Sequence, residues 1–122
     1  MRLEVARQKL AVLANAKQSV ELGPVGIAGV ISDACQAYRD LAADSAVLTA
    51  LRSEIETLAR TGSGARRIYA ALLLGQVDRQ AGTAELASLA DSTEACDLAL
   101  GGCTVMSATV GDAARHLLGR PS

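Results

Sequence analysis

Aromatic residues are almost absent from this chain. It contains no phenylalanine and no tryptophan, and its only aromatic residues are Tyr38 and Tyr69. Because β-sandwiches and β-barrels are usually filled by aromatic and β-branched side chains, this composition argues against an all-β fold. Half of the residues are nevertheless hydrophobic, so alanine, leucine and valine must fill the interior. These residues, together with only two prolines, favour helices, and we predict an all-α protein.

An excess of charge and a long hydrophobic run are also missing. Twelve Lys and Arg against thirteen Asp and Glu give a formal net charge of −1, so we expect no binding to nucleic acid or to an anionic membrane. The longest apolar run, residues 68–74, is far shorter than the ~20 residues of a membrane-spanning helix. Residues 1–5 lack the apolar stretch of a signal peptide. We therefore expect a cytoplasmic protein, folded as one helical domain over residues 1–122.

Residues that commonly carry chemistry are few. The three cysteines, an odd number at uneven spacing, fit reduced thiols better than a disulfide framework. Cys96 and Cys103 are too far apart in sequence for the close ligand spacing of a metal site. The single histidine, His116, lies near the C-terminal end of a predicted helix, where a positive charge interacts favourably with the helix dipole. A thiol–imidazole dyad has no support from the flanking sequence, so we predict no catalytic residue, no metal and no cofactor.

Apolar residues recur at steps of three and four, which is the spacing of amphipathic helices. The pattern predicts helices over 2–22, over 25–43, and from a cap at Asp44 or Ser45 to Leu58. The stripe of the first helix also suits a homodimer seam, with Lys17 at a core position, although packing within the chain is favoured. A fourth helix over 64–78 is apolar all round, so we expect Leu72 and Leu73 to be nearly fully buried.

The end of the chain offers two alternatives. Residues 80–82 should end the fourth helix, and Thr83 can cap a short helix through Ala90. Residues 93–110 can form a further helix, or a short hairpin near 97–106 that turns at Gly101-Gly102, and we favour the hairpin slightly. Thr109 and Asp112 resemble a capping box that opens a last helix over 110–118. The whole pattern predicts five or six helices in an antiparallel bundle.

The second half of the chain contains a weak internal repeat. Residues 68–75 align with residues 112–119 at an offset of 44, and helical-hairpin repeats have periods near ~40–47 residues. Residues 64–118 resemble HEAT-like repeats in their apolar helix 68–75, their turn at 78–82 and their second helix around 85–89. The resemblance implies a short α-solenoid that binds a partner without chemistry. Some bacterial immunity proteins, which neutralise a paired toxin, are of this kind.

Charge is unevenly distributed in this half. Residues 80–114 contain no Lys or Arg, whereas residues 60–79 contain four arginines against Asp78 alone. The acidic stretch fits either a solvated face or a patch that steers a basic partner. The candidate partner-binding residues are Glu85, Asp91, Glu94, Asp97 and Asp112. A candidate anion-binding site lies at the start of the fourth helix, where Arg66 and Arg67 follow Gly64.

These observations favour a non-catalytic protein-binding module over an enzyme. We expect a protein partner, which the acidic stretch predicts to be basic, and either a toxin-neutralising (immunity-type) or an adaptor role. The alternative is a regulatory domain that binds a small ligand between its alanine-rich helices.

Overall fold

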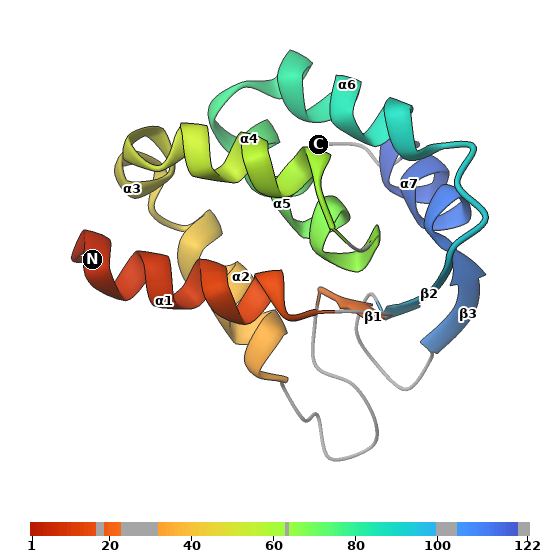
Figure 1. Ribbon diagram of the computed structural model, residues 1–122, viewed down its shortest axis with the longest axis horizontal. Helices are drawn as coiled ribbons and strands as arrows, with labels where there is room; N and C mark the ends of the chain where they lie inside the picture. The colour runs from red at the N-terminus through yellow and green to blue at the C-terminus, as the bar shows by residue number, and fades with distance from the viewer. Residues whose placement is uncertain (17–18, 23–31, 63, 100–104, 120–122) are drawn as a thin grey trace.

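A computed structural model describes residues 1–16, 19–22, 32–62, 64–99 and 105–119. This part of the chain forms seven helices and a small sheet at one end of the molecule (Figure 1). The helices are α1 (Leu3–Ala14), α2 (Asp33–Ala42), α3 (Ser45–Ala50), α4 (Arg52–Arg60), α5 (Gly64–Val77), α6 (Arg79–Leu89) and α7 (Val110–Leu118). The strands are β1 (Ser19–Glu21), β2 (Ala95–Ala99) and β3 (Val105–Thr109). The predicted all-α class is therefore confirmed only as a mostly helical fold. The described residues form seven helices instead of five or six, and a three-stranded sheet where a hairpin was expected.

Helix α5 is the central element of the core. It packs against α4 and α6 along its length and also contacts α1, α2, α3, α7 and β1. One cluster of buried side chains surrounds it, from Ala6 on α1 to Leu117 on α7. Leu73 is fully buried, as its apolar surroundings in the sequence predict, whereas Leu72 is only partly buried. A helix that is apolar on nearly every side thus lies between neighbours on several sides.

The sheet joins segments that are far apart in the sequence. Its strand order is β1-β2-β3, with β1 parallel and β3 antiparallel to β2. The β2–β3 pairing confirms the predicted hairpin but not its turn. Ala99 pairs with Val105, a register that differs by one residue from that of a two-residue turn at Gly101-Gly102, which lies outside the described residues. Thr109 and Asp112 form the predicted capping box, and α7 has the predicted bounds. These features were predictable because they depend on residues that are close in sequence.

The predicted first helix is wrong beyond Ala14. Helix α1 ends there, and Ser19–Glu21 forms strand β1 instead. Tyr69 on α5 explains the change, because its hydroxyl accepts from the Glu21 N–H at 2.7 Å and donates to the Glu21 carbonyl at 3.2 Å. Val20 is fully buried between these contacts and the pairing with Leu98. Such long-range contacts leave no signal in the local apolar spacing.

Two other helix boundaries differ from prediction. Helix α2 begins at Asp33 with Ser32 as its N-cap, and residues 25–31 of the expected helix lie outside the described residues. The expected third helix is divided at Leu51, which is itself buried and ends α3 before α4 begins. Asp44 is the N-cap of α3, as predicted. The division leaves both short helices with buried residues facing α5.

Gly82 was predicted to end a helix, and this prediction is wrong because Gly82 lies inside α6. Asp78 is the N-cap of α6, and its carboxylate accepts from the Ala81 N–H at 3.1 Å. A Cβ atom at Gly82 would come within 2.5 Å of the Gly75 Cα atom and 2.8 Å of the Ala71 carbonyl. Gly82 is therefore required for the close approach of α6 to α5, which outweighs its low helix propensity.

Candidate binding surface

Residues 90–94, the acidic segment between α6 and β2, lie against the first turns of α5 and α7. The Gly64 N–H at the start of α5 donates to the Glu94 carboxylate at 2.9 Å. At the start of α7, the Val110 N–H donates to the Glu94 carbonyl at 2.7 Å and the Gly111 N–H to the Ser92 carbonyl at 3.0 Å. Residues 92–94 thereby satisfy backbone donors that a helix leaves unpaired at its N-terminus. The acidic segment is consequently tied to the ends of α5 and α7.

Glycine is needed at both helix starts. A Cβ atom at Gly111 would lie 2.6 Å from the carbonyl oxygens of both Ala90 and Ser92. A Cβ atom at Gly64 would lie 2.7 Å from the Glu94 carboxylate and would overlap the Val110 side chain. The acidic segment can therefore approach the two helices closely only where side chains are missing.

Asp112 lies beside this segment, at the first turn of α7. Its carboxylate accepts from the Thr109 N–H at 3.2 Å and forms an ion pair with Arg115. The hydrogen bonds from Thr109 and then that from Arg115 lower the pKa of Asp112 below its ordinary value. Arg115 also donates to the Ala90 carbonyl, which joins α7 to the end of α6. Asp112 is thus ionised and structurally engaged.

Glu85 differs from the other four predicted acidic residues in being largely covered. Glu85 lies on α6 and pairs with Arg60 of α4 at 2.9 Å, where its side chain is only 13 % exposed. The hydrogen-bond sequence through residues 92–94 and 110–111 instead brings Asp91, Glu94 and Asp112 into one region. Asp97 follows in β2, between Ser19 and Ser107 in the sheet register.

All four of these acidic residues are exposed, but Asp91 and Asp97 differ from Glu94 and Asp112 in the contacts of their carboxylates. Within the described residues, neither side chain makes a hydrogen bond or an ion pair. We call Asp91, Glu94, Asp97 and Asp112 the acidic surface. The carboxylates of Glu94 and Asp112 bind groups at the starts of α5 and α7, whereas those of Asp91 and Asp97 face solvent.

The two arginines of the predicted anion site have contacts within the protein. Arg66 donates to the carbonyl and hydroxyl oxygens of Thr61, at 3.1 and 2.8 Å, and Arg67 donates to the Ala59 carbonyl at 3.0 Å. Both guanidinium groups therefore satisfy carbonyl groups at the C-terminal end of α4. The anion at the start of α5 is the chain's own Glu94 carboxylate, as expected of a helix N-terminus.

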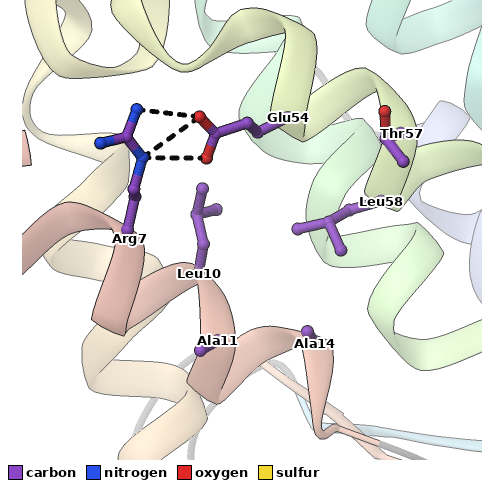
Figure 2. A pocket seen from close by; sticks show the side chains of 7 residues that line it. All are labelled: Arg7, Leu10, Ala11, Ala14, Glu54, Thr57 and Leu58. Atoms are coloured by element: carbon purple, nitrogen blue, oxygen red, sulfur yellow. Dashed lines mark hydrogen bonds and ion pairs between the residues drawn. The ribbon is translucent and has the colours of Figure 1, made fainter. Parts of the chain in front are cut away.

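A groove between α1 and α4 was not predicted. Figure 2 shows Leu10, Ala11 and Ala14 of α1 facing Thr57 and Leu58 of α4 across it. Its volume is about 320 Å³, and an ion pair between Arg7 and Glu54 crosses one end at 3.1 Å. The apolar stripe of the first helix predicted packing within the chain, but not that a groove would remain between α1 and α4.

The thiols described by the structure are buried. Cys35 and Cys96 are free, and burial is the largest cause of the raised pKa of each. For Cys96 the pKa rises to about 11, with further contributions from the charges of Asp97 and Glu94. His116 is exposed on α7, and Cys103 lies outside the described residues. Thiolates are the reactive form, so both buried thiols are unreactive at neutral pH.

The described residues contain no group of three or more His, Cys, Asp or Glu side chains placed to hold a metal ion. None of the helices in the described ranges has the length and apolar character needed to cross a membrane. No family model, curated protein or solved structure matches the chain.

Proposed function

We propose that this protein is a non-catalytic protein-binding module that receives a basic partner on the acidic surface. The observation that carries the proposal is the pair of exposed carboxylates, Asp91 and Asp97, in a stretch without Lys or Arg from residue 80 to residue 114. Exposed charge of one sign accelerates encounter with a partner of the opposite sign and disfavours other partners.

The anchoring of the acidic surface supports a binding role. Glu94 and its neighbours are attached to α5 and α7 by hydrogen bonds, so the carboxylates project from a fixed backbone. A prearranged surface loses less conformational entropy on binding than a flexible one. The more specific versions of this function are neutralisation of a toxin, as in immunity proteins, and an adaptor role between proteins.

The HEAT-like character of the second half remains part of this proposal. Helices α5 and α6 form a closely packed helical hairpin, with Gly82 against Gly75, and this supports one repeat unit. A second unit would need another helix packed antiparallel to α7, and strands β2 and β3 precede α7 instead. The proposed module is therefore one helical hairpin extended by a sheet.

The proposal is tested by reversing the two exposed charges. The wild-type protein is used as bait in an extract of its native host, and a captured protein is identified and purified. The variant Asp91→Lys/Asp97→Lys should associate with that partner at least tenfold more slowly at low salt, and its rate should depend less on ionic strength.

A matched control separates this surface from total charge. Glu4→Lys/Asp33→Lys changes the net charge equally, and both residues are exposed in first turns of other helices. The control should associate at the wild-type rate. Equal effects of the two double variants, or a partner that is not basic, would contradict the proposal.

The groove between α1 and α4 favours a second candidate function. Its walls are mostly apolar, and its volume of about 320 Å³ lies at the lower end of the range for ligand-binding pockets. Arg7 at its end could pair with an acidic group of a small apolar ligand if Glu54 were displaced. The groove thus supports the alternative of a small-ligand-binding regulatory domain.

A further inference from the structure

Strand β3 is the outer strand of the sheet. Within the described residues it pairs only with β2, and its other edge has no strand beside it (Figure 1). The backbone N–H and C=O groups along such an edge can pair with a strand of another chain.

The hydrogen-bond pattern identifies the groups at this edge. Val110 lies opposite Glu94 in the continued β2–β3 register, and the Val110 N–H donates to the Glu94 carbonyl. Since residues of an antiparallel pair alternate between bonded and non-bonded positions, Ala108 and Met106 direct their backbone groups toward β2. Val105, Ser107 and Thr109 direct theirs outward.

The capping box leaves two residues of β3 whose outward N–H groups can pair with another strand. The Thr109 N–H already donates to the Asp112 carboxylate, which also agrees with its outward direction. Among the described residues, no group accepts from the backbone N–H groups of Val105 and Ser107, which therefore remain for a further strand.

The two edges of the sheet differ in what lies against their backbone groups. At the β1 edge, the Tyr69 hydroxyl engages both the N–H and the C=O of Glu21. At the β3 edge, residues 105–109 contain no charged residue and no proline, which are the usual means of preventing edge-to-edge pairing. The β1 edge is thus closed by a side chain, whereas the β3 edge has the composition of a strand that accepts a partner.

Charge indicates which partner fits. A second copy of β3 would bring no charged residue opposite another, because the strand has none. The net charge of −1 also gives two copies little overall repulsion. Asp97 of each copy would be separated by three strand spacings, about 14 Å, which exceeds the screening length of about 8 Å at physiological salt.

We propose that two copies of this chain pair through β3 in antiparallel, two-fold fashion to form a continuous six-stranded sheet. Val105 of each copy lies opposite Ser107 of the other, so that the two residues exchange both backbone hydrogen bonds. Met106 lies on the two-fold axis opposite its own copy. This register uses the outward N–H groups of Val105 and Ser107 and leaves the Thr109–Asp112 capping box intact.

Sedimentation equilibrium, measured into the millimolar range of protein concentration, tests the proposal. The wild type should form dimers, and Ser107→Pro should weaken dimerisation at least tenfold because it removes an outward N–H. The β2–β3 ladder does not use that N–H, so the hairpin should tolerate proline there. Ser107→Thr keeps the N–H and is the matched control, which should dimerise like the wild type.

Amide hydrogen exchange gives an independent readout that does not need the proline variant to fold. The amides of Val105 and Ser107 in the wild type should exchange more slowly as protein concentration rises. Those of Met106 and Ala108 should be protected at every concentration. A wild type that stays monomeric throughout, or exchange at Val105 and Ser107 that is independent of concentration, would overturn the proposal.

Discussion

Tyr69 shows how much a single residue contributes in a chain with so few aromatic side chains. It is fully buried, it contacts the Tyr38 ring at a centroid distance of 5.7 Å, and its hydroxyl holds both backbone groups of Glu21. Desolvation by burial raises its pKa, which keeps the hydroxyl protonated. One side chain of α5 therefore fixes the position of β1, and through β1 one edge of the sheet.

Cys96 leads to a prediction about alkaline pH. Its pKa of about 11 in the folded state lies above the ordinary value of 9.0, so the unfolded chain loses its thiol proton first as pH rises. The stabilising effect is complete below about pH 9 and is lost between about pH 9 and 11. The free energy of unfolding should fall there by at most ~1.4 kcal/mol per pH unit for this thiol.

Urea denaturation of the wild type and Cys96→Ala at pH 7, 9, 10 and 11 checks this prediction. The variant should be less stable at pH 7 because it lacks buried volume, but its stability should decline less from pH 9 to 11. A residual decline is expected in both, since the pKa values of Cys35 and Tyr69 are also raised. Parallel curves for the two proteins would show that Cys96 does not titrate as argued.

At the scale of helices, the α5–α6 pair depends on two glycines with opposite tolerances. A Cβ atom at Gly82 would lie 2.5 Å from the Gly75 Cα atom, whereas one at Gly75 would meet only the Gly82 Cα atom, at 3.8 Å. Gly82→Ala should therefore destabilise the protein by about 1–3 kcal/mol through overpacking.

Gly75→Ala is the matched control for this prediction. It makes an ordinary contact and should stabilise the protein by up to about 1 kcal/mol through higher helix propensity. Thermal denaturation of both variants measures the difference. Similar shifts in Tm for the two would mean that α5 and α6 do not approach each other closely at Gly82.

Some helices and strands could be predicted from the sequence, and others could not. The capping box of Thr109 and the hairpin around it depend on neighbours, and both were predicted. Strand β1 was missed because Tyr69, far along the chain, determines it. The predicted start of α6 at Thr83 was too late, because Gly82 was interpreted as the end of the preceding helix. Gly82 instead allows α6 to contact α5.

The candidate site was predictable as a composition but not as a geometry. The stretch of acidic residues was evident in the sequence, but whether a carboxylate points to solvent depends on distant partners. Glu85 meets Arg60 and Glu94 meets the Gly64 N–H, so these two charges have structural contacts. Asp91 and Asp97 are the residues that stay available to a partner in the described structure.

Across the whole molecule, the two candidate binding regions lie on different elements. The acidic surface belongs to the β2 and α7 end, and the groove belongs to α1 and α4 on the opposite side of Figure 1. The two proposed functions can therefore be separated by variants that alter one region and leave the other unchanged.

A dye-binding experiment tests the groove directly. Anilinonaphthalene sulfonate, an apolar ring system with an anionic group, should bind the wild type with increased fluorescence, since the groove has apolar walls and Arg7 at one end. Ala11→Phe should fill the groove and weaken dye binding at least tenfold. Val12→Phe, on the next residue of α1, is exposed and does not line the groove, so it should bind dye like the wild type. Absence of binding to the wild type, or equal binding to both variants, would remove the support for a small-ligand function and leave the acidic surface as the candidate binding region.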